Sequence, residues 1–262
     1  MSVYAVEYIK DVEEGEMAAK LFLCSDGNVY IVKLMSNPNG KRSLFNELVS
    51  YRLGELLGLP IATGKIIIFS KKKLKDPKLL KRMAIEEGPH FGSLLIKNAS
   101  LYSSDKLYHC NNTFTLPEII MFDNWISNYD RREERQNILL SGNNPYQLAF
   151  IDHADAFYGP EWSIESLNYY TWNNHVIWGS TYEEFVPFID NADPFGLALN
   201  KLYSIKDEEI AAAFGKDIPS DWQVSKEEVK MLLFHLIIKK QQMKKTIADL
   251  RSYFPIWNSS RL

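Results

Sequence analysis

The sequence predicts an α+β protein with two lobes, a small β-rich lobe over residues 1–98 and a larger, mainly helical lobe over residues 99–262. Three observations support this division. Short apolar runs of strand-like composition dominate the first hundred residues, with one prominent helix among them. Longer segments with helical spacing dominate after residue 115. The intervening residues 99–115 are polar and turn-like, which places the boundary between the lobes there.

The small lobe contains a predicted β-hairpin. Apolar runs at residues 21–24 and 29–34 flank the sequence Ser25-Asp-Gly-Asn28. Asp-Gly between two β-rich runs is a strong hairpin signal, because glycine accepts a positive φ angle at little cost. Apolar runs at residues 65–69 and 91–97 predict two further strands of the same lobe.

One helix is predicted in the small lobe, over residues 43–57. Its apolar residues recur at helical spacing and form one stripe: Phe45, Val49, Leu53 and either Leu56 or Leu57. The sequence Gly58-Leu-Pro60 ends it, because glycine favours the turn after a helix and proline cannot continue one.

The large lobe begins with a predicted helix over residues 116–127 that has a broad apolar face. Two short strands follow at residues 137–140 and 147–151, joined by a turn-rich connection. The last and longest helix starts with a capping box, in which Ser225 is the N-cap and Glu228 follows three residues later. The helices predicted in the rest of the lobe cover residues 181–189, 196–203, 207–214 and 225–253.

Composition excludes several classes of protein. The formal net charge is −3, so the chain as a whole is not a nucleic-acid binder. The two cysteines, Cys24 and Cys110, are far apart, which argues against a disulfide scaffold or a zinc knuckle. A cluster of basic residues reads as a solvated loop and helix face: Lys71, Lys72, Lys73, Lys75, Lys78, Lys81 and Arg82.

The sequence also predicts a soluble protein of the cytoplasm without a membrane partner. The first sixteen residues are acidic and lack the apolar core of a signal peptide. No apolar run approaches the roughly 18 residues that a membrane span requires.

Five polar residues stand near predicted strand ends or on the predicted helix, in an order that matters more than any one of them: Lys33, Glu47, Asp130, Asn137 and Asp152. Kinases have their phosphoryl-transfer residues in the same order along the chain. A lysine in a strand comes first, then a glutamate in a helix, an aspartate followed by an asparagine, a hairpin and a second aspartate. Each residue alone has an ordinary explanation as a solvated side chain.

Phosphoryl transfer explains why these residue types are needed. A lysine places a positive charge on nucleotide phosphates, and a carboxylate holds the lysine. Mg²⁺ prefers oxygen ligands, which Asn137 and Asp152 supply from the two ends of a hairpin. A further aspartate, Asp130, orients the attacking hydroxyl and accepts its proton.

The sequence resembles the compact HipA-like kinases, relatives of a serine/threonine kinase with a fold akin to protein and phosphatidylinositol kinases. The matching stretches are YIVKL, LFNELVSYRLGELLGLP, FDNWISNYDR, NILL and LAFIDHADAF, and the ending IPSDWQVSKEEV is also similar. The resemblance implies ATP-dependent phosphorylation of a hydroxyl-bearing acceptor. It implies Lys33 for the phosphates with Glu47 as its partner, Asp130 as the catalytic aspartate, and Asn137 with Asp152 for Mg²⁺.

The sequence departs from the protein-kinase pattern in two places. Asp130 and Asn137 are seven residues apart, where the protein-kinase loop has five. There is no GxGxxG loop, so the candidate cover for the phosphates is the hairpin turn with Ser25 and Gly27, which is otherwise a plain turn.

Several neighbouring residues allow two interpretations. His153 either contacts phosphate or metal, or packs in the core, and packing is favoured. Arg131 either holds phosphate or pairs with a nearby acid. Asp123 is interpreted as a structural hydrogen-bonding residue. Residues 89–93 precede a predicted strand and either lie against a nucleotide base or form an ordinary loop.

Three functions remain open from the sequence. The first is an active kinase, which the joint presence of Lys33, Asp130 and Asp152 favours, and a serine/threonine protein kinase in particular. The second is a nucleotide-binding scaffold or pseudokinase without turnover. The third is a small-molecule phosphotransferase. The sequence does not separate protein, lipid and small-molecule acceptors.

Overall fold

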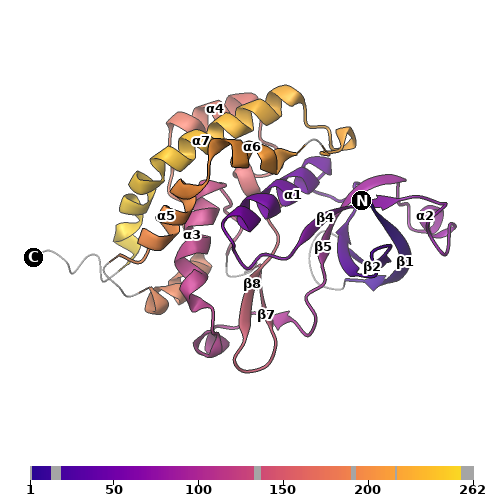
Figure 1. Cartoon of the computed structure of the whole chain (residues 1–262), viewed down its shortest axis with the longest axis horizontal. Coiled ribbons are helices and arrows are strands. Elements are labelled where there is room, and N and C mark those ends of the chain that lie inside the picture. The colour runs from indigo at the N-terminus through magenta and orange to yellow at the C-terminus, as the bar shows by residue number, and fades with distance from the viewer. Residues whose placement is uncertain (1, 13–18, 133–136, 190–192, 216, 255–262) are drawn as a thin grey trace, which may run out of the picture.

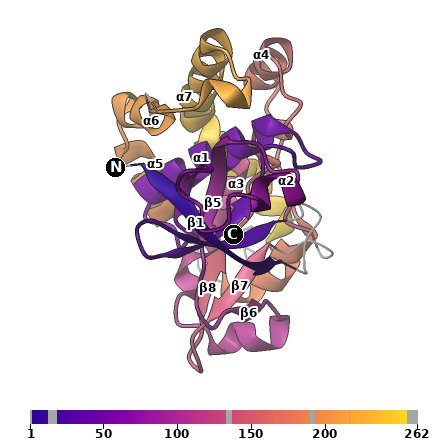
Figure 2. The same cartoon turned by 90° about the vertical axis from the view of Figure 1, so that its right-hand side faces the viewer.

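The computed structural model describes residues 2–12, 19–132, 137–189, 193–215 and 217–254. Figure 1 shows a strand-rich part at one end of the molecule and a mainly helical part at the other. The predicted α+β class and its order along the chain, strands first and helices later, are confirmed. In the view of Figure 2, the strand-rich part faces the reader.

The strand-rich part is a five-stranded sheet that closes on itself in the order β1-β2-β3-β5-β4. Neighbouring strands are antiparallel except β1 and β4, which pair in parallel through Val3 with Ile67 and Tyr4 with Ile68. The strands are β1 (Val3–Asp11), β2 (Lys20–Cys24), β3 (Val29–Lys33), β4 (Gly64–Phe69) and β5 (Gly88–Leu94).

Two predictions for this sheet need correction. Strand β1 was not predicted, although Val3 and Ala5 alternate with less buried neighbours. The strand predicted at residues 91–97 lies at 88–94, so residues 89–93 belong to β5 and are not a loop that precedes it. Pro89 is accommodated inside this strand, where it pairs with Ile68 of β4.

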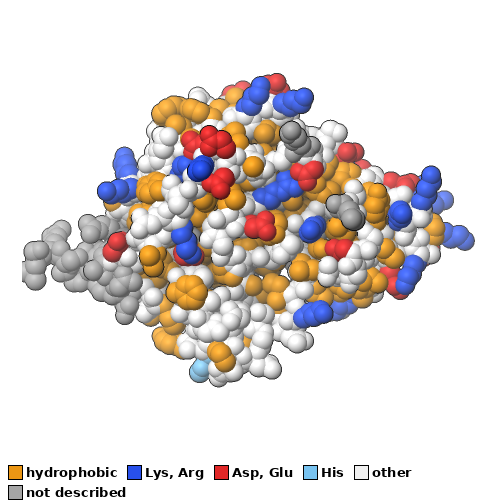
Figure 3. All heavy atoms as spheres, in the orientation of Figure 1, with side chains coloured by type: hydrophobic (Ala, Val, Ile, Leu, Met, Phe, Trp, Pro, Cys, Tyr) orange, Lys and Arg blue, Asp and Glu red, His pale blue; other side chains and the backbone are white. Residues whose placement is uncertain are grey.

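An apolar core fills the closed sheet. Phe22 and Phe69 are buried at its centre, and their rings meet edge to face with centroids 4.8 Å apart. The short helix α2 (Leu79–Arg82) adds Leu79 and Leu80 to this core. The basic residues around α2 are all exposed and gather at one end of the surface in Figure 3, as expected for a solvated face.

Helix α1 (Lys41–Leu56) lies between the closed sheet and the helical part (Figure 1). The predicted apolar stripe is buried, and it continues to Leu57, which is 4% exposed, and not to Leu56, which is 39% exposed. Polar residues on other faces of the helix, including Asn46 and Glu47, are buried as well. This burial on several sides follows from the position of α1 between two bodies, which a single amphipathic stripe does not reveal.

The helical part also holds a small antiparallel sheet in the order β6-β7-β8. Its strands are β6 (Ser100–Leu101), β7 (Ile138–Ser141) and β8 (Gln147–Phe150). Strand β8 is tied to the chain that leaves α1, because the Phe150 N–H donates to the Pro60 carbonyl at 2.8 Å. Gly54 of α1 makes room for this connection, since a Cβ atom there would lie 2.2 Å from the Ile61 side chain.

The helices of this part agree with the predictions, with three differences. Helix α4 follows a Ser163–Ser166 capping box and was not predicted. Residues 180–188 form a 3₁₀ helix that contains Pro187. The α-helix predicted to reach Tyr253 ends at Asp249 and continues as a 3₁₀ turn. The α-helices are α3 (Leu116–Trp125), α4 (Ile164–Trp172), α5 (Gly196–Ser204), α6 (Asp207–Phe214) and α7 (Lys226–Asp249).

Short 3₁₀ helices connect these elements. They are η1 (Ser104–His109), η2 (Thr113–Thr115), η3 (Ala156–Tyr158), η4 (Ser180–Phe188), η5 (Ser220–Trp222) and η6 (Leu250–Tyr253). None of the helices in the described part of the chain combines the length and apolar character needed to cross a membrane.

Candidate active site

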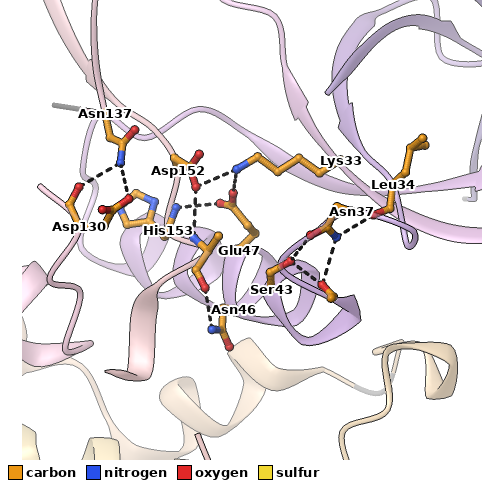
Figure 4. A network of polar contacts seen from close by, with 12 residues as sticks. Lys33, Leu34, Asn37, Ser43, Asn46, Glu47, Asp130, Asn137, Asp152 and His153 are labelled. Carbon is orange, nitrogen blue, oxygen red and sulfur yellow. Dashed lines mark hydrogen bonds and ion pairs between the residues drawn. The ribbon is translucent and has the colours of Figure 1, made fainter. Parts of the chain in front are cut away.

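Lys33 stands at the end of β3 with its ammonium group between two carboxylates (Figure 4). Its Nζ makes a short ion pair with Oε1 of Glu47 on α1 and lies 2.8 Å from Oδ1 of Asp152, which follows β8. Strand, helix and hairpin thus converge on one buried cation. The ion pair expected between Lys33 and Glu47 is formed.

The charges of this trio do not balance. One ammonium faces two carboxylates, so the three ionised groups carry an excess of one negative charge. Burial disfavours the charged form of Lys33, but Asp152 and Glu47 outweigh it and raise the pKa of the lysine. Burial, with the charge of Asp152, raises the pKa of Glu47 to about 7 despite the attraction of Lys33.

Asp152 keeps its charge and remains accessible. Burial opposes ionisation of its carboxyl group, but the nearby Lys33 lowers the pKa below the usual value. The Asp152 side chain is 31% exposed, against 5% for Glu47. A ligand can therefore reach the carboxylate that carries the excess negative charge.

Asn137 and Asp130 form the other half of the site. The Asn137 Nδ2 donates to the Asp130 backbone carbonyl at 3.2 Å and to its Oδ2 at 3.3 Å. The amide nitrogen faces Asp130, which directs the carbonyl oxygen of Asn137 to the other side. Arg132 Nη2 lies 2.9 Å from Asp130 Oδ1 and balances its charge. Residues 133–136, which include the charged Glu133, Glu134 and Arg135, lie outside the described residues.

The hairpin β7–β8 brings Asn137 and Asp152 to the same end. The Ile151 N–H donates to the Asn137 carbonyl at 3.0 Å, and Asp152 is the next residue. Both site residues adopt the left-handed conformation, with φ of 52° and 56°. Asparagine and aspartate tolerate this conformation better than other residues with a Cβ atom, which suits these two types to the ends of the hairpin.

Asp123 and Arg131 make a second ionic cluster beside the first, and both side chains are fully buried. Arg131 Nε and Nη2 donate to the two carboxylate oxygens of Asp123 at 2.6 and 3.2 Å. Asn128 Nδ2 at 3.0 Å and the Tyr182 hydroxyl also donate to this carboxylate. The structural role predicted for Asp123 is confirmed, and Arg131 pairs with an acid.

His153 packs in the core, as favoured from the sequence. Its ring is 2% exposed and meets Phe122 edge to face with centroids 5.8 Å apart. Burial and the charge of Arg131 lower the pKa of His153 to about 4, so the imidazole is neutral. Its backbone N–H donates to Glu47 Oε2 at 3.0 Å. His153 therefore contributes its backbone to the site.

The structure does not bring Ser25 and Gly27 together with the other five predicted residues. Strand β2 pairs with β3 so that Leu23 faces Val29 and Lys20 faces Val32. The turn at residues 25–28 therefore lies at the opposite end of β3 from Lys33. Its polar groups are used within the sheet, since Ser25 Oγ accepts the Tyr4 N–H at 2.9 Å.

Three polar contacts of the site were not predicted from the sequence. Asn46, next to Glu47 on α1, donates from Nδ2 to the carbonyls of Ala154 and Ala156 at 2.8 and 3.0 Å. Its Oδ1 accepts the Trp162 indole N–H at 2.9 Å. A single asparagine on a predicted helix face gives no signal of such a role, because its partners are backbone groups far along the chain.

The residues present fit a magnesium ion of the kind that nucleotide-dependent enzymes use. No group of three or more His, Cys, Asp and Glu side chains in the described ranges could hold a metal by itself. Mg²⁺ in such enzymes takes one or two protein ligands and completes its shell with phosphate oxygens and water. Asp152 and Asn137 offer one carboxylate and one amide oxygen, which are donors of this type.

Comparisons with known proteins agree with this geometry. The sequence matches the profile of a family described as HipA-like kinase over residues 5–252. A comparison with curated protein sequences gave no significant match. The proinflammatory kinase CtkA of Helicobacter pylori has a similar structure, with a TM-score of 0.60 and 14% sequence identity, covering 93% of this chain and 98% of that one.

The Golgi casein kinase is also similar in structure. Its complex with Mn and ADP gives a TM-score of 0.51 at 12% identity, covering 99% of this chain and 73% of that one. A second structure of the same kinase gives 0.50 at 12% identity, covering 99% and 72%. At such low identities these likenesses establish the fold, which is that of a kinase.

Proposed function

Because the chain belongs to the HipA-like kinase family, we propose that it transfers the γ-phosphate of ATP, with Mg²⁺, to a hydroxyl group of serine or threonine in a protein. The observation that carries this proposal is the position of the Lys33 ammonium group between Glu47 and Asp152. A cation held by two carboxylates at the end of a rigid strand is placed to contact phosphate oxygens.

Each residue of the site has one task in this proposal. Lys33 contacts the phosphates, and Glu47 holds the lysine in place. Asp152 and Asn137 would hold Mg²⁺, which when bound neutralises the charge that develops on the transferred phosphate. Asp130 orients the acceptor hydroxyl and takes its proton. The Arg132 guanidinium, 2.9 Å from Asp130, offsets the charge of the carboxylate before the acceptor arrives.

Two further observations support the proposal. One structural relative was solved with Mn and ADP bound, so the fold admits a nucleotide and a divalent metal. Lys33 contacts Glu47 and Asp152, Asn137 contacts Asp130, and the excess negative charge at Asp152 is suited to a cation. A scaffold without catalysis has no need of Asp130 beside this set.

Phosphate transfer from γ-labelled ATP tests the proposal directly. The purified protein is incubated with labelled ATP and Mg²⁺, alone and with a mixture of protein acceptors, and EDTA serves as the metal-free control. We expect label on serine or threonine after acid hydrolysis, and none with EDTA or with Lys33→Met. Calorimetric binding of Mg·ATP without transfer would favour the non-catalytic alternative. Transfer to free metabolites but not to protein would favour the small-molecule phosphotransferase.

A further inference from the structure

The chain that follows Asp152 is held in an unfavourable conformation. Asp152, Phe157 and Tyr158 have positive φ angles of 56°, 61° and 69°, and Gly159 follows at 94°. Residues with a Cβ atom lose on the order of 1 kcal/mol or more in this region. Such a conformation persists only where contacts from outside the segment fix it.

Contacts from the helical part fix the far half of this segment. The Phe157 N–H donates to the Ile126 carbonyl at 2.7 Å, and the Tyr158 N–H donates to the Ser127 carbonyl at 3.2 Å. These bonds begin five residues after Asp152. In the near half, residues 153–156, the His153 ring packs against Phe122 of α3, and the backbone is held by helix α1.

Helix α1 fixes the near half through two successive side chains. Glu47 Oε2 accepts the His153 N–H at 3.0 Å, while its Oε1 pairs with Lys33. Asn46 Nδ2 donates one hydrogen to the Ala154 carbonyl and the other to the Ala156 carbonyl. Two neighbouring residues of α1 therefore fix the position of the Lys33 ammonium group and of the backbone that follows Asp152, as Figure 4 shows.

The Asn46 amide is fully committed and cannot turn. Its side chain is fully buried, both N–H bonds are used, and Oδ1 accepts the Trp162 indole N–H. Trp162 is itself fixed, since the Arg42 guanidinium lies 4.4 Å above its ring and pairs with Glu228 at the start of α7. A side chain with two donors and one acceptor is required here, and an ionised carboxylate of the same shape offers acceptors only.

We propose that Asn46 is a positioning residue that holds residues 153–156 against α1 and thereby aims the Asp152 carboxylate at the metal and at Lys33. The inference rests on the proposed function for its effect on Mg²⁺. Its structural half, the restraint of the segment by Asn46, does not depend on turnover.

Asn46→Asp is the decisive variant, because it keeps the shape and the acceptor for Trp162 but removes both donors. We expect the Mg²⁺ concentration for half-maximal transfer to rise roughly 10- to 100-fold, as for partners that orient a metal ligand. Binding of ATP without Mg²⁺ is expected to stay within about twofold. Hydrogen exchange of a peptide covering residues 153–158 is expected to accelerate by a similar factor.

Asn124→Asp is the matched control. Asn124 is also fully buried, donates from Nδ2 to the Ile120 and Ile177 carbonyls at 2.9 and 3.0 Å, and accepts the Ile177 N–H at 2.8 Å. It ties α3 to Ile177 and does not touch the segment after Asp152. We expect a lower melting temperature, with the Mg²⁺ requirement and the exchange of residues 153–158 as in the parent.

Several outcomes decide the inference. An Asn46→Asp protein with a lower melting temperature but the parent's Mg²⁺ requirement and the parent's exchange at 153–158 overturns it. If this variant does not fold, Trp162→Phe decides, because it removes the indole N–H that fixes the Asn46 amide and reduces the ring beneath Arg42, while Asn46 itself is kept. Unchanged exchange at 153–158 and an unchanged Mg²⁺ requirement would then overturn the inference. If the parent does not transfer phosphate, the proposed function fails, while the exchange experiment still tests the restraint by Asn46.

Discussion

Two buried ionic clusters lie side by side in this protein, and they differ in how their charges are balanced. In the first, Asp123 receives four donated hydrogen bonds, two from Arg131 and one each from Asn128 and Tyr182. Both charged side chains are 0% exposed. In the second, one lysine serves two carboxylates, and the Asp152 side chain remains 31% exposed.

This difference in charge balance and exposure distinguishes a structural ion pair from a cluster that can bind a ligand. A carboxylate with every oxygen bonded inside the protein has nothing left to offer a ligand. An accessible carboxylate in a cluster with excess negative charge gains from a cation that arrives from solution. Two residues of the same type, Asp123 and Asp152, thus differ in what they leave open to a ligand.

The largest expected effect is the loss of phosphate transfer when Asp130 is changed. Its sequence neighbour Arg131 belongs to the cluster of Asp123, in which the charges are balanced. Asp130→Asn should lower single-turnover transfer by about 10² to 10⁴, because the acceptor hydroxyl loses its base. Calorimetric affinity for Mg·ATP should remain close to that of the parent, because the amide leaves Asp152 untouched. Turnover at the parent's rate would show that Asp130 is a structural acid and not the base.

The next largest effect is a loss of stability when the pair of Asp123 and Arg131 is broken. Asp123→Asn leaves the buried Arg131 guanidinium without a counter-charge, which should lower the free energy of unfolding by about 3–5 kcal/mol. Urea denaturation measures this loss. The exposed pair Arg52–Asp217 supplies the control, since the Asp217 side chain is 60% exposed and Asp217→Asn should cost less than about 1 kcal/mol. Equal losses in the two variants would contradict the comparison.

Asp152→Asn should have the opposite effect to Asp123→Asn, with stability kept and ligand affinity lost. It removes the excess negative charge and leaves Lys33 paired with Glu47, so the free energy of unfolding should be retained or raised. Mg·ATP affinity should fall roughly tenfold or more, because even indirect partners of a metal ligand cost about that much. Calorimetry with and without Mg²⁺, beside urea denaturation, checks both halves. A loss of stability with unchanged affinity would make this cluster structural as well.

The smallest effect concerns a third buried charge, Lys239 of α7, which is 0% exposed. Its Nζ lies 3.0 Å from the Ser127 hydroxyl oxygen, 3.4 Å from the Tyr158 hydroxyl oxygen and 5.5 Å from the centre of the Tyr158 ring, and neutral His235 lies one turn earlier on α7. Burial lowers the pKa of Lys239 from 10.5 to about 7. Charge at this site is therefore a cost and not a contribution to stability.

The sign of the pH dependence follows from this pKa. Between pH 7 and 10.5 the unfolded chain keeps the proton that folded Lys239 releases, so the free energy of unfolding should rise with pH, by up to about 1.4 kcal/mol per unit. Lys239→Met should flatten the rise and should be more stable than the parent at pH 7. Urea midpoints at pH 7.5 and 8.5 test this, because the ionisation of Cys24 in the unfolded chain, with a pKa near 9.0, affects parent and variant alike. Equal slopes in parent and variant would show that Lys239 is charged when folded.

The parts of the fold that depend on local pattern were predictable. The stripe of α1, the turn at residues 25–28 and the capping box at Ser225 each depend on neighbours in sequence. Strand β1 pairs with its neighbour β2 and with β4, some sixty residues away, but only Val3 and Ala5 of its residues are buried, so its apolar alternation is too short to predict it. The left-handed residues after Asp152 depend on contacts with α1 and α3, which no short window of sequence contains.

The same limit applies to the site. The order along the chain predicted one common site for Lys33, Glu47, Asp130, Asn137 and Asp152. In the structure Lys33 contacts Glu47 and Asp152, and Asn137 contacts Asp130, while the roles of the five residues stay a prediction. Ser25 and Gly27 were chosen from turn chemistry alone, and strand pairing places them away from Lys33. The role of Asn46 could not be predicted, because a buried amide with backbone partners looks like any helix asparagine until the fold is known.

The position of α1 between two bodies has a consequence for how the protein is made. Arg42 of α1 pairs with Glu228, 186 residues later, and Asn46 bonds Trp162, 116 residues later. At a synthesis rate of about 5–20 residues per second, roughly 10 to 40 s separate the appearance of the first pair of partners. Asn46 and Glu47 gain their partners when residues 153–162 emerge, and Arg42 gains its partner only when Glu228 emerges. The nascent chain therefore passes through most of its synthesis before the contacts that fix α1 are complete.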